Sequence, residues 1–313
     1  MTGPVLAAAG LCFAYEPDRP VLSGADIAMH AGRRVAVLGP NGGGKTTLFR
    51  LLVGALAPGA GQVLLNGEPV RRNRRGLTEL RRQVQLVLQD PDDQLFAASV
   101  AQDVSFGPVN LGLPAAEVRD RVDGALSALG IADLADRPTH LLSFGQKKRV
   151  AIAGAVAMAP RLLVLDEPTA GLDPAGVEEL LHTLAALHAA GTTPVLSTHD
   201  VDLAHRWADE VAVVAHGRVV TGPAAAVLGD AALLRSARLG PAWAPAVHRL
   251  LDRVDGAGDA RPRTAAELHA LLGADVVGVD RHAHPPSGTM GRGGGLSAAP
   301  PVTARSSASE EIL

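Results

Sequence analysis

Cysteine, lysine, aromatic side chains and long apolar runs are all scarce in this 313-residue chain. Cys12 is the only cysteine, so no intrachain disulfide can form and a reducing compartment is expected. The best apolar stretch, 150–159, is too short to span a bilayer and is followed by Pro160 and Arg161. The first residues also lack the charged start and apolar core of a signal peptide. We therefore expect a protein with no membrane-spanning segment.

Neither sign of charge is in large excess. The 29 basic and 32 acidic residues leave a formal net charge of −3, which gives no global basic field for nucleic acid. A basic segment lies between two strand-like stretches, and a solvated helix face is its favoured interpretation, with membrane-surface contact as the alternative. This arginine segment comprises Arg71, Arg72, Arg74, Arg75, Arg81 and Arg82.

Residues 39–47 read GPNGGGKTT, which fits the phosphate-loop pattern GxxxxGK(S/T) between a strand-like run and a helix-like stretch. Glycines without a Cβ let backbone N–H groups turn inward and form an anion nest at the helix start. Lys45 would add charge at the β- and γ-phosphates, and the Thr46 hydroxyl would join a Mg²⁺ shell. A simple glycine turn is the alternative. The predicted nucleotide-binding residues here are Gly39, Pro40, Asn41, Gly42, Gly43, Gly44, Lys45, Thr46 and Thr47.

The aliphatic run 162–165 ends in two adjacent carboxylates, Asp166 and Glu167. Such a run predicts a buried parallel strand, whose carboxyl end is where open α/β sheets bind ligands. Strand alternation points the two acids to opposite sides, so Asp166 is predicted as a Mg²⁺ ligand and Glu167 as the base for an attacking water. A solvated acidic loop is the alternative.

Together with the segment LSFGQKKRVAIAGAVAMAP, these motifs resemble those of the ATP-binding cassette (ABC) ATPases over about residues 11–222. The resemblance implies that Ser143, Gly145 and Gln146 open a helix presented to the ATP of a second subunit. A plain helix N-cap by Ser143 is the alternative. Phe144 stands where glycine is usual in the family, which we interpret as tuning. If it instead disables hydrolysis, the chain is a nucleotide-gated scaffold.

The same resemblance assigns four further residues. Tyr15 matches the aromatic residue that stacks on adenine, with core packing by its neighbour Phe13 as the competing assignment. Gln89 matches the loop glutamine that reaches Mg²⁺ and the attacking water. Asp173 matches the loop that crosses to the other subunit, and His199 matches the switch histidine on the γ-phosphate.

The expected fold is an α/β phosphate-loop NTPase fold of the ABC type, with a RecA-like core, an antiparallel β subdomain and a helical subdomain. Strand-like segments predict antiparallel strands over 5–37, and alternating strands and helices predict a parallel sheet over 161–220. Between 99 and 142 the sequence predicts helices broken by Gly107, Pro108, Gly112 and Pro114.

Three regions are predicted along the chain. Residues 1–226 form the ABC ATPase domain, and 227–281 form a small helical C-terminal extension. Residues 282–313 are rich in Pro, Gly, Ser and Ala and are predicted to be a disordered tail. His282 and His284 in this tail are interpreted as incidental, with weak metal binding as the alternative.

The segment QDPDDQLFAASVAQDVSFGP resembles the corresponding loop in ATPases of energy-coupling factor (ECF) transporters, especially the cobalt and nickel branch. Its acidic pair Asp92 and Asp93 and its apolar Leu95 and Phe96 could grip short coupling helices of a membrane protein. A surface loop with a local apolar anchor is the alternative.

The resemblance implies an ATP-hydrolysing subunit of a metal-ion importer, peripheral at the cytoplasmic face of the cell membrane. Its implied cofactors are ATP and Mg²⁺. Its implied partners are a second ABC ATPase subunit, identical or homologous, a transmembrane coupling subunit and a substrate-binding membrane subunit, and no nucleic acid. Vitamin transport and a soluble, non-transport ABC ATPase remain the alternatives.

Overall fold

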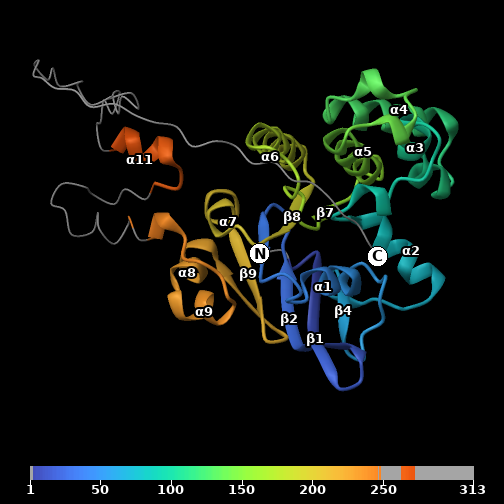
Figure 1. The fold of residues 1–313 in the computed structure, drawn as a ribbon. Helices are drawn as coiled ribbons and strands as arrows, with labels where there is room; N and C mark the ends of the chain where they lie inside the picture. Colours follow the sequence, from blue (N-terminus) through green and yellow to red (C-terminus); the bar gives the residue numbers. More distant parts are fainter. Residues whose placement is uncertain (1–2, 246, 248–261, 272–313) are drawn as a thin grey trace, which may run out of the picture. The chain divides into compact units, whose positions relative to one another are not determined.

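The structure is a computed structural model that describes residues 3–245, 247 and 262–271. Its first sheet is built from strands in the N-terminal part of the chain (Figure 1). Its strand order is β2-β1-β4-β5, and every neighbouring pair is antiparallel. The predicted antiparallel opening therefore forms, except that its last run, 35–37, belongs to the second sheet. The strands are β1 (Leu6–Glu16), β2 (Arg19–Met29), β4 (Ala60–Leu65) and β5 (Glu68–Pro69).

The second sheet is the predicted parallel one, with strand order β10-β9-β3-β8-β7-β6. Only β10 runs antiparallel to its neighbour, because a tight turn at His216 and Gly217 joins it to β9. Both turn residues have positive φ, of 50° and 74°, which matches the twist of a two-residue hairpin. The strands are β3 (Val35–Leu38), β6 (Val84–Val87), β7 (Leu162–Leu165), β8 (Thr193–Thr198), β9 (Glu210–Ala215) and β10 (Arg218–Pro223).

Two hydrophobic clusters lie on opposite faces of this parallel sheet. Since side chains alternate along a strand, Leu163 and Leu165 of β7 enter the cluster that contacts the helices α3 to α7. Leu162 and Val164 enter the other cluster, which includes the buried face of α1 and the antiparallel sheet. The parity of each strand residue therefore decides which layer its side chain meets.

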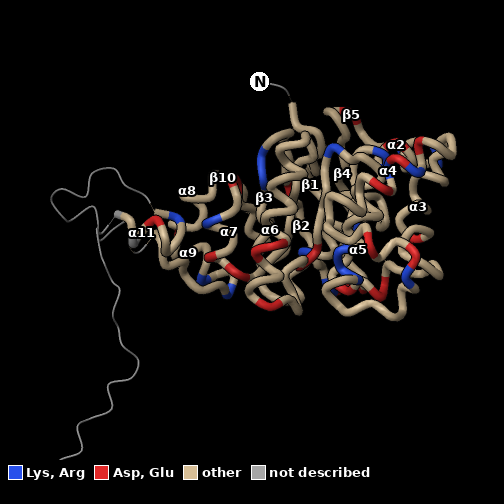
Figure 2. Tube along the Cα trace, turned by 90° about the horizontal axis from the view of Figure 1, so that it is seen from above, with Lys and Arg blue, Asp and Glu red and all other residues tan. Residues whose placement is uncertain are grey.

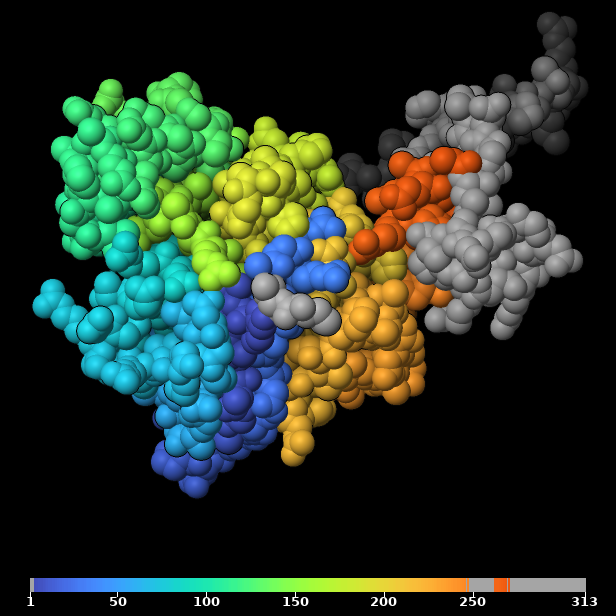
Figure 3. All heavy atoms as spheres, turned by 180° about the vertical axis from the view of Figure 1, so that it is seen from behind, coloured from blue at the N-terminus to red at the C-terminus, as the bar shows by residue number. Residues whose placement is uncertain are grey.

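Three helices, α3, α4 and α5, form a group to one side of the sheets, visible as the green block in Figure 3. The predicted break at Gly107 and Pro108 is wrong, because α3 runs through both residues. At Gly107 the helix lies close to Met158: a Cβ there would lie 2.4 Å from the sulfur of this flexible side chain. The helices α1 to α7 are α1 (Lys45–Leu52), α2 (Arg74–Gln83), α3 (Val100–Asn110), α4 (Ala115–Ala128), α5 (Phe144–Val156), α6 (Pro174–Ala189) and α7 (Val201–Trp207).

Single turns of 3₁₀ helix connect several of these elements: η1 (Pro91–Asp93), η2 (Ala132–Leu134) and η3 (Thr139–Leu141). Acidic and basic residues are interspersed along the helices (Figure 2). In the described parts of the chain, no helix combines the length and the hydropathy needed to cross a bilayer.

Beyond β10 the chain forms α8 (Ala224–Gly229), α9 (Ala231–Ser236) and α11 (Ala265–Leu271). Val227 and Leu228 of α8 and Leu234 of α9 are buried in the same cluster as residues of β7 and α5. The helices α8 and α9 therefore pack on the same core as the parallel sheet. The Arg263 guanidinium donates hydrogen bonds to the carbonyls of His205 and Ala208 at the end of α7, at 2.6 and 2.7 Å. The predicted tail with His282 and His284 lies outside the described residues.

Candidate nucleotide-binding site

Four parallel strands end at one edge of the second sheet, and each is followed by predicted site residues. The phosphate loop follows β3, Gln89 follows β6, Asp166 and Glu167 follow β7, and His199 follows β8. Ligands of open α/β sheets bind outside the carboxyl ends of the strands. Residues from four separate parts of the sequence therefore share the edge at which a ligand is expected.

The phosphate loop needs its glycines for different reasons. Gly42 and Gly44 have positive φ, of 74° and 100°, and Gly44 is the N-cap of α1. Gly39 and Gly43 instead lie close to other atoms, since a Cβ would approach the Val214 carbonyl or Pro40 to 2.9 Å. The N–H groups at the start of α1 have no acceptor within the helix. They form a bare backbone surface suited to phosphate oxygens.

Lys45 is buried, with 6% of its surface exposed. Its ammonium donates hydrogen bonds to the carbonyls of Gly39 at 2.8 Å and Pro40 at 3.3 Å. It also forms an ion pair with Glu167 Oε1 at 3.1 Å. The lysine charge thus lies within the loop and opposite a buried carboxylate, where an incoming phosphate would compete for it.

Asp166 is 2% exposed and accepts hydrogen bonds from two hydroxyls. Thr46 Oγ1 donates to one carboxylate oxygen and Ser197 Oγ to the other, each at 2.6 Å. A hydroxyl and a carboxylate held together are oxygen donors of the kind that Mg²⁺ prefers. The residues present therefore fit this ion. Among the described residues, no cluster of three or more His, Cys, Asp or Glu ligands occurs.

Glu167 has a left-handed backbone, with φ of 45°, and its side chain is 8% exposed. Its N–H donates to Ser197 Oγ at 2.8 Å, and its Oε2 lies 3.2 Å from His199 Nδ1. A non-glycine residue in this region is strained, and such strain persists only where surrounding contacts enforce it. The Ser197 hydroxyl and the Lys45 ammonium supply those contacts.

The sequence analysis did not identify Ser197, although the alternation of side chains along β8 could have indicated it. Val195 faces the α1 side of the sheet, so Ser197, two residues on, faces the same side as Asp166. A fully buried serine at a strand end beside an acidic pair is a candidate for orienting that pair. Ser197 is one of three hydroxyl side chains in β8, with Thr193 and Thr198, so its polarity alone did not single it out.

Tyr15 lies next to the phosphate loop and is 59% exposed. Its hydroxyl is 3.3 Å from Thr47 Oγ1, and its ring meets the Phe13 ring edge to face at 4.9 Å between centroids. Phe13 packs against the cluster beneath the sheet. Phe13 is thus a packing residue and Tyr15 presents an accessible ring, and the stacking of Tyr15 on adenine stays a prediction.

Gln89 is exposed after β6, and none of the hydrogen bonds joining Thr46, Asp166 and Ser197 includes it. Gln94, which the sequence prediction missed, holds this loop instead. Its Oε1 accepts the Leu88 N–H at 3.0 Å, and its Nε2 donates to the Ala151 carbonyl of α5 at 3.1 Å. The loop that carries Gln89 is therefore fastened to the helical group.

Ser143, Gly145 and Gln146, here called the signature residues, lie at the start of α5, the signature helix. Ser143 and Gln146 form a capping box: Ser143 Oγ accepts the Gln146 N–H at 3.3 Å, and Gln146 Oε1 accepts the Ser143 N–H at 3.0 Å. Ser143 remains exposed. Asp173 is likewise exposed and caps α6, where Oδ1 accepts the Gly176 N–H at 2.7 Å. Both are fixed at helix starts while still facing outward.

Comparison with known proteins matches residues 22–170 to the ABC transporter family. A candidate ABC transporter ATP-binding protein of Streptomyces coelicolor is 60% identical over 85% of this chain and 95% of its own length. The chain belongs to the ABC transporter ATPases. Its similarity to cobalt import and energy-coupling factor ATPases also places this chain among the ABC ATPases of the energy-coupling factor type.

The cobalt import ATP-binding protein CbiO of Rhodobacter capsulatus is 54% identical over 86% of this chain and 97% of its own length. The energy-coupling factor transporter ATP-binding protein EcfA of Methanocaldococcus jannaschii is 47% identical over 73% of this chain and 82% of its own length. A solved structure of CbiO1 from Clostridium perfringens, part of the transporter complex CbiONQ, covers 80% of this chain and 99% of its own, with 43% identity and a TM-score of 0.67.

Family membership identifies the chemistry of the edge described above. ABC transporter ATP-binding proteins are ATPases, so this chain binds and hydrolyses ATP. The buried and mutually bonded groups at the ends of β3, β7 and β8 are the residues predicted from the sequence to bind the nucleotide. Ser143 and Asp173 lie at exposed helix starts, where their side chains accept the N–H groups of Gln146 and Gly176.

Proposed function

We propose that this ABC ATPase energises the uptake of a transition-metal ion, cobalt or nickel, through separate membrane subunits. The observation that carries the proposal is the 54% identity to a cobalt import protein, nearly all of whose length is matched. The similarity to a subunit of a CbiONQ complex supports the same assignment. In this role the chain sits at the cytoplasmic face of the membrane, held there by its partners.

Glu167 is proposed as the base that takes a proton from the attacking water. It is buried beside Lys45, its backbone is held by Ser197, and its second oxygen contacts His199. A positioned base of this kind contributes roughly 10² to 10⁴-fold in rate. When the γ-phosphate arrives, Lys45 would turn from Glu167 to the phosphate oxygens and leave the carboxylate free to accept the proton. His199 would donate to the γ-phosphate.

Thr46 and Asp166 are proposed to hold Mg²⁺, with Gln89 joining them once its loop moves inward. When bound, the ion neutralises developing charge on the β- and γ-phosphates. Asp166 also keeps the Thr46 hydroxyl oriented through their 2.6 Å hydrogen bond. Tyr15 is proposed to stack on adenine with its exposed ring.

The remaining ligands of ATP are proposed to come from a second copy or a homologue. Ser143 and Gly145 stand at the start of α5, where free backbone N–H groups face solvent and suit a phosphate. Asp173 would cross to the same partner from the start of α6. Hydrolysis then requires a dimer, since neither exposed set completes the site within its own chain.

A groove beside the Gln89 loop is proposed to receive a coupling helix of the membrane subunit. It has a volume of about 480 Å³ and is lined by Phe96, Phe106, Arg81 and Met158 among others. The two phenylalanine rings meet edge to face at 4.7 Å and are 64% and 51% exposed. Exposed aromatic anchors in a groove suit an amphipathic helix. Because Gln94 ties this loop to α5, movement of the helix would reach the signature residues.

The cargo is tested by uptake in cells that lack their own cobalt and nickel importers. Cells that express this chain with the membrane proteins that copurify with it should accumulate labelled Co²⁺ or Ni²⁺, and a Glu167→Gln chain should not. A labelled vitamin serves as the third substrate. Vitamin uptake without metal uptake would contradict the metal assignment and retain the ECF ATPase.

The groove is tested by copurification with the membrane subunit. Phe96→Asp should abolish copurification while leaving ATP binding intact, because the charge falls in the groove and not at the phosphate loop. Val220→Asp is the control, since Val220 is 45% exposed on β10 and does not line the groove. Retained copurification of Phe96→Asp would contradict the proposed docking site.

A further inference from the structure

Lys148 is a buried cation that the proposed function does not use. It lies in the second turn of α5, is 2% exposed, and is one of the chain's three lysines. Its ammonium donates a 2.7 Å hydrogen bond to the Ala170 carbonyl. Burial lowers the pKa of Lys148 from 10.5 to about 8, although the negative charges of Asp90 and Glu167 oppose that shift. A lysine is kept in such a place only when its partners repay the desolvation.

The carbonyl that Lys148 holds belongs to the turn between the two β7 acids and α6. Within this turn the Ala170 N–H donates to the Glu167 carbonyl at 3.1 Å, and the Leu172 N–H donates to the Thr169 carbonyl at 3.2 Å. Asp173 then caps α6. The proposed base and the proposed cross-subunit aspartate are thus the two ends of one turn, and its middle is tied to α5.

Phe144 makes the second contact between α5 and this turn. Its ring lies under the Lys148 ammonium, 5.1 Å from nitrogen to centroid, which is a cation–π distance. The ring also presses on Gly171, where a Cβ would lie 2.7 Å from a ring carbon. Gly171 has φ of 76° and no side chain, so the ring can reach its backbone. Phe144, which stands where the family usually has glycine, therefore contacts Lys148 and Gly171.

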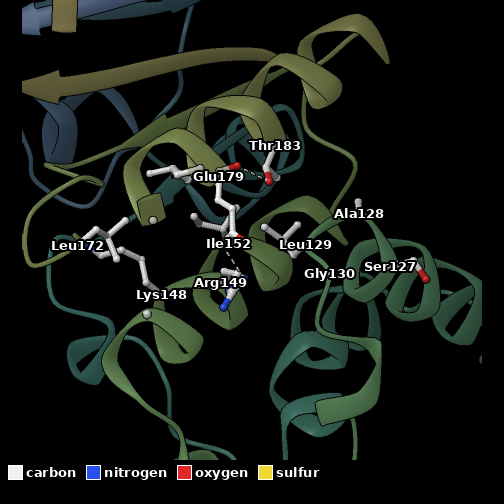
Figure 4. Close-up of a pocket in the computed structure, with 13 residues that line it drawn as sticks. Ser127, Ala128, Leu129, Gly130, Lys148, Arg149, Ile152, Leu172, Glu179 and Thr183 are labelled. Atoms are coloured by element: carbon white, nitrogen blue, oxygen red, sulfur yellow. Dashed lines mark hydrogen bonds and ion pairs between the residues drawn. The ribbon is translucent and has the colours of Figure 1, made fainter. Parts of the chain in front are cut away.

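Leu172 of the turn also packs against the cluster that includes α5 residues. A cavity of about 350 Å³ lies between α5, the start of α6 and the end of α4. Figure 4 shows Lys148 and Leu172 next to each other at one end of it and Ser127 at the other. Across the cavity Arg149 and Glu179 form an ion pair at 3.1 Å between side chains that are 38% and 70% exposed. A solvated pair of this kind holds weakly.

We propose that Lys148 and Phe144 are positioning residues for ATP hydrolysis, which hold the 167–173 turn against the signature helix so that Glu167 and Asp173 keep their places. The proposal rests on the proposed roles of those two acids. It predicts that α5, moved by a partner at its start, carries the turn with it. It also gives Phe144 a constructive role, where the sequence alone allowed tuning or loss.

The test is steady-state ATPase activity of the assembled complex, separated into kcat and KM. Lys148→Met should lower kcat on the order of 10- to 100-fold, the scale of a displacement of about 1 Å in a catalytic group. The KM for ATP should stay within about twofold, because Lys148 does not touch the phosphate loop. Lys148→Arg keeps a charged donor and should recover most of the lost kcat. A purely structural role would instead lower the melting temperature of both variants and leave kcat of the folded fraction unchanged.

A surface variant keeps the proposal testable if Lys148→Met fails to fold. Phe144→Gly restores the usual family residue, yet it should lower kcat in the same way, with Phe144→Tyr retaining activity. Leu141→Ala is the control, since Leu141 is 58% exposed just before α5 and contacts neither Lys148 nor Gly171. Wild-type kcat in Phe144→Gly and Lys148→Met overturns the proposal.

These outcomes are separate from those that test the proposed function. If the wild-type complex hydrolyses ATP and Glu167→Gln does not, the roles at the sheet edge stand whatever Lys148 does. If Glu167→Gln retains full turnover, the proposed function fails, and the inference about the turn fails with it. If Glu167→Gln is inactive and Lys148→Met is fully active, only the inference fails.

Discussion

The phosphate-loop edge and the signature end of α5 differ in how their functional groups are satisfied. At the edge, Lys45, Asp166 and Glu167 are buried and each bonds to another residue of the same chain. At the signature end, Ser143 is exposed and its side chain bonds to the Gln146 N–H in its own capping box. The groups of the first region are buried and bonded within the chain, whereas the helix start of the second region is exposed. Their difference is the physical reason to expect that two chains make one complete site.

The largest expected effect comes from removing the charge of Glu167. Glu167→Gln should lower turnover by roughly 10² to 10⁴-fold, because the positioned base is lost while the shape is kept. ATP binding should persist, since Lys45 is released from its ion pair and is free for phosphate. Turnover and nucleotide binding are measured side by side. Glu178→Gln is the matched control: Glu178 pairs with Arg206 on the surface and should leave turnover unchanged. Similar turnover in both variants would remove Glu167 from the role of base.

The next effect tests whether the two regions meet between chains. Ser143→Arg and Lys45→Met should each lower turnover by about a hundredfold, because each removes phosphate ligands. A mixture of the two variants should regain measurable turnover if one composite site per dimer suffices, since one of its sites then combines an intact phosphate loop with an intact Ser143. Absence of any recovery, with mixed dimers shown to form, would contradict the shared site.

A smaller effect is expected at Ser197, within the buried first region. Ser197→Ala leaves the buried Glu167 N–H without its acceptor, which costs about 1–3 kcal/mol. The backbone at Glu167 should relax, and kcat should fall about tenfold on the general scale of a misplaced catalytic group. Ser197→Thr keeps the hydroxyl and serves as the comparison in kcat and in melting temperature. Unchanged kcat in Ser197→Ala would mean that Lys45 and His199 alone place Glu167.

The smallest effect concerns stability outside the site, at the Arg34 and Asp209 pair. The Arg34 guanidinium and backbone N–H donate to Asp209 at 2.9 to 3.2 Å. Burial alone would raise the pKa of Asp209, but the hydrogen bonds and charge of Arg34 outweigh it and lower that pKa. The pair therefore stabilises the fold above the ordinary carboxyl pKa, and this contribution is lost as pH falls through the lowered value.

Arg34→Met should accordingly reduce the free energy of unfolding at pH 7 by about 2 kcal/mol. The difference from wild type should shrink below about pH 4, where the unfolded carboxyl takes up its proton. Urea unfolding at both pH values measures it, and Arg19→Met controls for loss of an exposed pair, since Arg19 is 82% exposed. A difference independent of pH would assign the loss to packing of Arg34 against Trp207, 5.9 Å from its ring.

Much of the fold followed from local patterns. The apolar runs at 35–38 and 162–165 became buried parallel strands, and the motifs after them reached the same sheet edge because parallel strands share a direction. The predicted helix interruption at Gly107 and Pro108 was wrong, since a glycine next to Met158 and a proline in a last turn look like a break in the sequence.

The site residues also fall into those that a local pattern predicted and those that it did not. Lys45, Thr46, Asp166 and Glu167 were named from their spacing, since a phosphate loop and a strand-end acid pair are local features. Ser197, Gln94 and Lys148 were missed because each acts on a segment 30, 57 or 22 positions away in the chain, at Glu167, Ala151 and Ala170. Strand alternation could have placed Ser197 on the face of Asp166, but no local pattern shows which distant segment Gln94 or Lys148 contacts.

The sequence by itself determined which backbone could cradle phosphate and which strand ends would carry acid, because glycine, β-branched and acidic residues impose those choices within a few positions. Only the tertiary structure decided that Tyr15 is exposed while Phe13 is packed, that Ser197 joins Asp166 to Glu167, and that Phe144 lies between Lys148 and Gly171. Those outcomes depend on packing between distant segments, where small differences in distance decide which contact forms.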